Sequence, residues 1–166
     1  MANQSSTAFG LRPLRKVGQT DNNAGLGEWD KASGAAAIYH HELVQMQGTG
    51  YVLSAGAGGA LLVGSLNGSF YTDPTTSKPT WSNYAPNNAA TDMVCLINDD
   101  PQQMFEMMTA LTSLTQADAG ATAPIVATGN SGAPNYISGF TIGAATTVVN
   151  QLKLLGLTRD TLSQDV

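Results

Sequence analysis

The apolar residues of this chain come in short runs, and this shortness is what most limits the folds open to it. Uninterrupted apolar runs are only a few residues long, as at Ala60–Val63, and turn-forming residues separate them. Such runs are too short to cross a membrane and have the length of β-strands. About eight of them at regular spacing predict an all-β fold, a compact β-barrel or β-sandwich with long loops.

Composition agrees with short strands and tight turns. Charged residues make up only 11% of the 166 residues, against about 25% in an average soluble domain. Gly, Ala, Ser, Thr and Asn together account for about half of the chain, and these small residues favour turns and loops. A net charge of −5 argues against nucleic acid as a partner. The single cysteine, Cys95, excludes an internal disulfide and is expected in the core.

The sequence predicts two parts, an extended N-terminal arm over residues 1–30 and a single β-rich domain over residues 31–166. Glycines and prolines punctuate the first part, and its apolar residues show no strand or helix period. We expect this arm either to be a mobile terminus or to become ordered on a partner's surface. Its candidate contacts are three apolar anchors and three basic residues: Phe9, Leu11, Leu14, Arg12, Arg15 and Lys16.

Within the domain, Asn67-Gly68 is the dipeptide typical of a two-residue hairpin turn. It predicts a hairpin of Leu61–Leu66 and Ser69–Thr72. Ile38–Met46 is expected to form one strand, and Met93–Ile97 a fully buried one. Residues 101–114 fit two structures, because Pro101 and the spacing of the methionines favour a short helix, whereas alternation around Phe105 favours a strand.

Two constellations could suggest chemistry, and neither is convincing. Gly129–Pro134 resembles the nucleophile motif of chymotrypsin-like proteases, with His41 and Asp92 upstream of Ser131, but Asn130 replaces the aspartate of that motif. His40 and His41 are adjacent, so in a strand they would point to opposite faces and could not chelate one metal ion. We therefore predict no catalytic residues, no metal site and no cofactor.

Several segments, in their order along the chain, resemble the capsid decoration (cement) proteins of tailed bacteriophages. The resemblance covers about residues 8–158 and rests on structural rather than catalytic motifs. The matching segments are Ala8–Gly18, Glu42-Leu43-Val44, Val63–Pro74, Asp99-Asp100-Pro101 with Phe105-Glu106, and Leu152–Leu157.

The resemblance implies a non-enzymatic structural protein of the virion. Such a protein binds the outer surface of the mature phage head after assembly in the host cytoplasm, and it bridges neighbouring capsomers against the pressure of the DNA. Its implied partners are the major capsid protein and other copies of itself, a trimer being slightly favoured over a dimer. The family pattern after Phe105-Glu106 also favours a strand over residues 101–114.

Two other functions fit parts of the sequence. A carbohydrate- or surface-binding β module would place Trp81, Tyr84 and Tyr136 along one groove. A serine hydrolase would bring Ser131, His41 and Asp92 within hydrogen-bonding reach of one another. Both of these alternatives make geometric demands that a structure can test.

Overall fold

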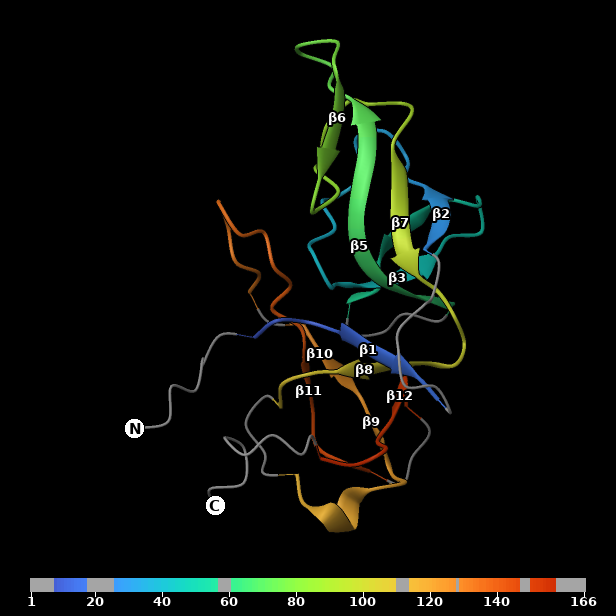
Figure 1. Ribbon diagram of the computed structural model, residues 1–166, viewed down its shortest axis with the longest axis vertical. Helices are drawn as coiled ribbons and strands as arrows, with labels where there is room; N and C mark the ends of the chain where they lie inside the picture. The colour runs from blue at the N-terminus through green and yellow to red at the C-terminus, as the bar shows by residue number, and fades with distance from the viewer. Residues whose placement is uncertain are drawn as a thin grey trace.

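A computed structural model describes residues 8–17, 26–56, 61–109, 114–127, 129–146 and 150–157. Within these ranges every regular element is a β-strand except for one 3₁₀ turn, η2 (Gln116–Asp118). The prediction of an all-β fold is therefore confirmed. Figure 1 shows the strands gathered in an upper lobe, which contains one large sheet, and a lower lobe of small two-stranded sheets.

The upper lobe is a six-stranded antiparallel sheet. Its order is β2-β7-β5-β3-β4, with β6 paired to the far end of β5. The strands are β2 (Gly27–Asp30), β3 (Leu43–Met46), β4 (Val52–Ser54), β5 (Leu62–Thr72), β6 (Pro79–Ser82) and β7 (Val94–Asn98).

β5 is the centre of this sheet, and it corrects the predicted hairpin. The chain runs straight through Asn67-Gly68, and the turn to β6 lies instead between Thr72 and Pro79. Leu66 and Gly68 face consecutive residues of β7, so Asn67 is the extra residue of a β-bulge. A glycine suits this position because the Trp81 ring covers it: a Cβ on Gly68 would lie 2.8 Å from Trp81 Cζ2.

The large sheet curls strongly on itself. Its edge strands β2 and β4 approach each other at one isolated bridge, Lys31 with Val52. Lys31 is buried there, and its ammonium donates hydrogen bonds to the carbonyls of Ala35 (2.9 Å) and Pro86 (3.1 Å). Burial lowers the pKa of Lys31. The described strands thus form a curved sheet joined at that single point, with no ladder closing it into a barrel.

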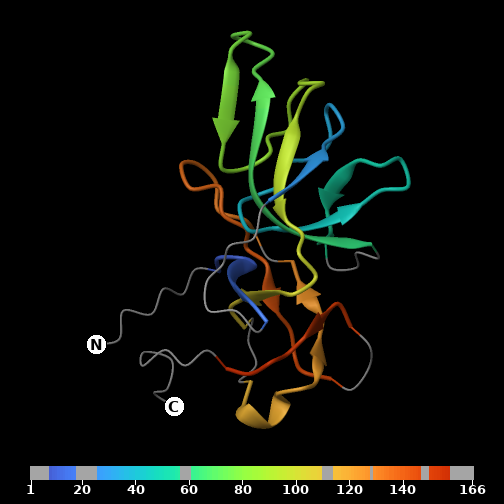
Figure 2. The ribbon, with the colours of Figure 1, turned by 45° about the vertical axis from the view of Figure 1, so that its right-hand side comes forward.

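The lower lobe is built from three two-stranded antiparallel sheets, β1-β8, β10-β11 and β12-β9 (Figure 2). Its strands are β1 (Arg12–Lys16), β8 (Gln103–Glu106), β9 (Thr122–Ala123), β10 (Ile125–Val126), β11 (Thr141–Ile142) and β12 (Leu152–Lys153). The strand reading of residues 101–114 is right where the chain is described, and the helix is not formed there, because β8 pairs with β1. Residues 110–113 lie outside the described ranges.

The predicted boundary between an arm and a domain does not match the positions of the described N-terminal strands. β1 is half of a lower sheet, and β2 is an edge strand of the upper sheet. Each finds its hydrogen-bond partners in strands far along the chain, a long-range pairing that local sequence patterns do not reveal. The expected strand Ile38–Met46 is likewise shortened to β3, since His41 adopts a positive φ of 59°.

Each lobe has its own cluster of buried side chains. The upper cluster lies under the large sheet and includes Leu66, Ile97 and Cys95, which is buried as predicted. The lower cluster contains Leu11, Leu43, Ala55, Ile125 and Phe140. Because Leu43 belongs to β3 of the upper sheet, the lower core is closed by the end of the upper lobe.

Candidate interaction surface

Leu11, one of the three expected anchors of the arm, is buried inside the molecule. Its side chain is 1% exposed and belongs to the lower core. Its N–H donates to the carbonyl of His41 (2.8 Å), and the preceding Gly10 packs so closely on that carbonyl that a Cβ would lie 2.4 Å from it. In this structure Leu11 is unavailable to a partner, because folding already uses it.

Two of the three basic residues are paired within the chain. Arg12 forms an ion pair with Glu106 on the neighbouring strand, and its guanidinium lies 5.1 Å from the centre of the Phe9 ring. Lys16 pairs with Asp100 at 2.5 Å, and the hydrogen bond from Lys16 is the main cause that lowers the pKa of Asp100. These contacts fasten β1 to β8 and to the turn that precedes it, and they leave less positive charge for a partner than the sequence suggested.

Of the six candidate residues of the arm, Arg12, Leu14 and Arg15 are exposed, and Arg12 is already paired with Glu106. Leu14 is 40% exposed, Arg15 is exposed, and no ion pair of Arg15 is found within the described part of the chain. Val17, which sequence reasoning did not select, is 57% exposed beside them. We refer to Leu14, Arg15 and Val17, three neighbouring exposed residues at the end of β1, two apolar and one basic, as the β1 patch.

A second exposed patch lies on the outer face of the large sheet, and sequence reasoning missed it. Phe70 of β5 and Trp81 of β6 are directly opposite each other, and they are 50% and 57% exposed. A cue was present in the alternation of β5, where Ser69 and Tyr71 are buried and Phe70 points the other way. The predicted hairpin hid this cue, because it placed these residues in a separate, shorter strand.

Two of the three aromatic residues of the carbohydrate-binding hypothesis, Tyr84 and Tyr136, pack on each other. Tyr84 and Tyr136 stack face to face, with ring centroids 4.0 Å apart, so each ring covers a face of the other. The Trp81 ring packs over Gly68. The tyrosine pair instead helps to fix the loop around residue 136 to the loop after β6, where Asn83 also donates to the carbonyl of Asn135.

The three residues of the hydrolase hypothesis are not assembled. Asp92 accepts the N–H of Thr72 at one end of β5, whereas the N–H of His41 donates to the carbonyl of Leu66. Six residues of strand separate these two points, roughly 20 Å. Ser131 is occupied locally, since its Oγ donates to the Ile137 carbonyl and accepts the N–H of the same residue.

The two adjacent histidines lie differently from the prediction. Their rings stack, with centroids 3.8 Å apart, because His41 is not in a strand and its positive φ turns it toward His40. Burial is the main cause that lowers the pKa of His41, to about 4, so the ring is neutral at pH 7. Along the described residues, no group of three or more His, Cys, Asp or Glu could hold a metal ion.

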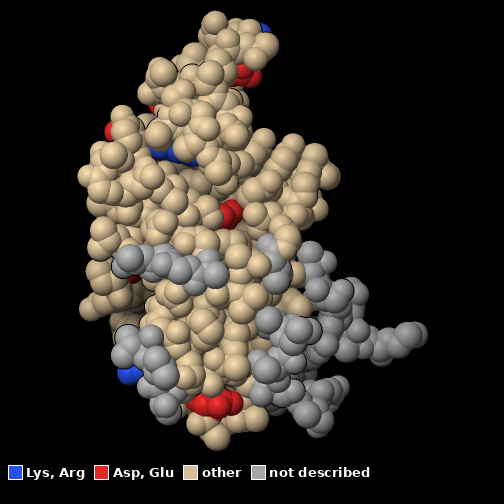
Figure 3. Space-filling view, turned by 180° about the vertical axis from the view of Figure 1, so that it is seen from behind, with Lys and Arg blue, Asp and Glu red and all other residues tan. Residues whose placement is uncertain are grey.

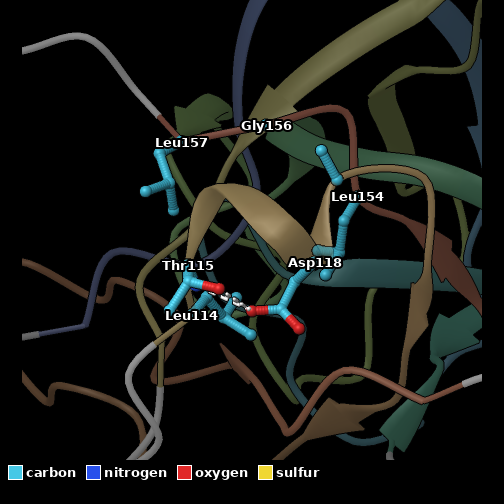
Figure 4. A pocket seen from close by; sticks show the side chains of 7 residues that line it. Leu114, Thr115, Asp118, Leu154, Gly156 and Leu157 are labelled. Carbon is cyan, nitrogen blue, oxygen red and sulfur yellow. Dashed lines mark hydrogen bonds between the residues drawn. The ribbon is translucent and has the colours of Figure 1, made fainter.

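Two hollows on the described surface offer little to a ligand. The one in Figure 4 lies between η2 and the segment after β12, where Thr115 Oγ1 donates to Asp118. Its cavity volume is about 10 Å³, room for at most one water molecule. A larger hollow of about 370 Å³ near Thr72 and Asp92 is open to solvent and lined by small residues.

The surface seen from behind carries few charges, which are scattered rather than clustered (Figure 3). In the part of the chain that the structure describes, no helix is long and apolar enough to cross a membrane. Comparisons with protein-family models, with curated proteins and with solved structures gave no match to this chain.

Proposed function

We propose that this chain is a structural decoration protein, which binds the outside of the mature phage head and bridges neighbouring capsomers. The observation that carries the proposal is the exposure of apolar side chains at two places on the sheets. Leu14 is exposed on β1 and Val17 directly after it, and Phe70 and Trp81 are exposed side by side on β5 and β6. Exposed apolar patches of this kind are typical of protein–protein contact.

The segments that resemble decoration proteins have structural roles in this fold, which supports the proposal. Val63–Pro74 supplies most of β5, the strand that pairs with β3, β6 and β7. Asp99 accepts a hydrogen bond from the Trp29 indole (3.0 Å), and Asp100 accepts the N–H of Gln102 (2.8 Å) while pairing with Lys16. Structural roles of this kind fit a protein whose function is mechanical.

The β1 patch is the proposed contact with the major capsid protein. Leu14 and Val17 are apolar groups that a partner can cover, and Arg15 can pair with an acidic residue of the shell. A specific contact of this kind buries about 1,000 Å² or more in total. Each copy then binds the shell with modest affinity, and the many copies on the symmetric shell together stabilise it.

Binding to heads tests this proposal. Expanded heads are assembled from the major capsid protein of the same phage, without this chain, and the purified chain is added before sedimentation. We expect the wild type to sediment with the heads, and Leu14→Asp and Arg15→Glu each to weaken binding at least about tenfold. The matched controls are Leu61→Asp and Lys78→Glu, which make the same changes at exposed positions elsewhere.

Deleting residues 1–18 is the less informative experiment, because it would remove β1 and the buried Leu11 along with the exposed side chains. Point substitutions on the β1 patch leave the lower core intact. If the wild type stays in the supernatant at saturating concentration, or if the two controls lose as much binding as the two test variants, the proposal is wrong.

A further inference from the structure

Four side chains form a single row across the outer face of the large sheet. Asp30 of β2 is opposite Val94 of β7, Val94 is opposite Phe70 of β5, and Phe70 is opposite Trp81 of β6. Because neighbouring strands are about 4.8 Å apart, this row is roughly 14 Å long. It carries a carboxylate at one end and two exposed aromatic rings at the other.

The next row strengthens the acidic end. Glu28 is opposite Leu96, which in turn is opposite Gly68. Glu28 and Asp30 are both exposed and two residues apart, so their carboxylates point from the same face of β2. The sheet face therefore offers an apolar aromatic surface bordered by two negative charges, which is complementary to an apolar segment that carries a positive charge.

The lower lobe presents a segment of that kind. Lys153 and Leu155 are exposed on the same side of an extended stretch, because Leu154 between them turns inward. Leu155 is 59% exposed and Leu157 48%. Residues two apart along an extended chain are about 6.7 Å apart, so Lys153 and Leu155 present a positive charge and an apolar side chain close together. Leu157 follows Gly156, whose φ is positive, and lines the hollow beside η2.

We propose that Lys153 and Leu155 of one copy bind across the row Asp30–Phe70–Trp81 of a second copy. Lys153 pairs with the carboxylates of Asp30 and Glu28, and Leu155 packs against the rings of Phe70 and Trp81. Charge complementarity and the exposure of apolar residues on both surfaces favour a second copy as the occupant.

Such a contact joins two different surfaces of the chain. The row lies in the upper lobe, and Lys153 is in β12 of the lower lobe (Figure 1). Two copies can make the contact reciprocally in a twofold dimer, or it can repeat from copy to copy in a ring or a chain. The β1 patch takes no part in this contact and stays free for the shell.

Disulfide trapping between two variants tests the contact on the full chain. Phe70→Cys and Leu155→Cys are mixed at equal concentration with oxidised glutathione. We expect a disulfide-linked heterodimer, and much less cross-linking by either variant alone, since Phe70 faces Leu155 and not another Phe70. The native Cys95 stays silent, because it is buried and burial raises the pKa of its thiol to about 12.

Two matched pairings set the background. Phe70→Cys mixed with Leu61→Cys, or with Leu14→Cys, should give at least about tenfold less heterodimer, although both leucines are exposed. Equal cross-linking with Leu61→Cys would mean random collision, and stronger cross-linking with Leu14→Cys would make the β1 patch the occupant. Either result overturns the proposal.

A charge exchange tests the role of Lys153. Adding Lys153→Glu to the Leu155→Cys chain should cut heterodimer yield several-fold, and adding Asp30→Lys to the Phe70→Cys chain should restore most of it. Sedimentation velocity from about 10 to about 500 µM, the range for small interfaces, should show association for the wild type and little for Trp81→Ala. A wild type that stays monomeric throughout contradicts the contact. These experiments use no heads, so failure here is distinct from failure of capsid binding.

Discussion

The two lobes reach an all-β structure in different ways. The upper lobe is organised by β5, an 11-residue strand that pairs with three others. In the lower lobe four of the six strands, β9 to β12, are only two residues long. A ladder of hydrogen bonds defines the first lobe, whereas the second depends on side-chain packing and on β1, which arrives from the N-terminal end. The lower lobe is therefore the one that single substitutions should disturb most selectively.

The largest expected effect on stability distinguishes Leu11 from Leu14. Both leucines were predicted from the sequence to be anchors of the arm. Leu11→Ala leaves a cavity in the lower core and should reduce the free energy of unfolding by about 3–4 kcal/mol. Leu14→Ala, at a position 40% exposed, should cost less than about 1 kcal/mol. Urea denaturation measures both.

Hydrogen exchange shows which lobe loses stability when Leu11 is replaced by alanine. With Leu11→Ala, the amides of β8, β10 and β11 should lose more protection than those of β5 and β7. An equal loss of protection in both lobes would show that they unfold as one unit. The lobes would then differ in architecture but not in stability.

Gly64→Ala tests the upper lobe in the same way, with a slightly smaller effect. A Cβ on Gly64 would lie 1.9 Å from the carbonyl oxygen of Asn98, so the crossing of β5 and β7 must shift. We expect a loss of about 3 kcal/mol. Gly48→Ala is the control, since its Cβ would have nothing within 4 Å, and it should stay within about 0.5 kcal/mol of wild type.

The junction between the lobes should respond to acid through His41. Its folded pKa of about 4 is below the unfolded value of 6.5, so the unfolded chain binds the proton first as pH falls. This contribution to stability is present above pH 6.5 and is lost between pH 6.5 and about 4. Allowing for partial exposure of the ring, we expect a loss of about 2 kcal/mol.

His41→Asn is the variant that isolates this contribution, because asparagine tolerates the positive φ and does not titrate. Unfolding measured at several pH values should show a flatter slope between pH 6.5 and 4 than in the wild type. An unchanged slope would assign the acid sensitivity to other groups.

The smallest effect is expected from the ion pairs of β1. Arg12→Ala removes the pair with Glu106, and Lys16→Ala the pair with Asp100. Because both pairs are partly solvated, each variant should cost about 1 kcal/mol or less, and the loss should shrink in high salt. A loss above about 2 kcal/mol would show that these pairs do more than fasten an edge.

The sequence was informative where the structure is local. Short apolar runs with frequent turn residues predicted the strand-rich fold, and the continuous run around Cys95 predicted a strand. That strand is not fully buried as expected, because Val94 and Leu96 of β7 are only partly buried on the outer face of the sheet. The sequence misled where long-range pairing decides the outcome: Asn67-Gly68 is a bulge because β7 continues alongside it, and Leu11 is buried because β8 and Phe140 enclose it. The exposure of Phe70 and Trp81 depends on the same pairing, so it could be seen only in the folded chain.

The most direct test of capsid decoration is a cryo-EM map of the filled phage head. We predict this chain on the outer surface, at the joints between capsomers, with Leu14 and Arg15 against the shell and Phe70 and Trp81 turned away from it. A head with no density for this chain, or density only on the inner surface, would contradict the account.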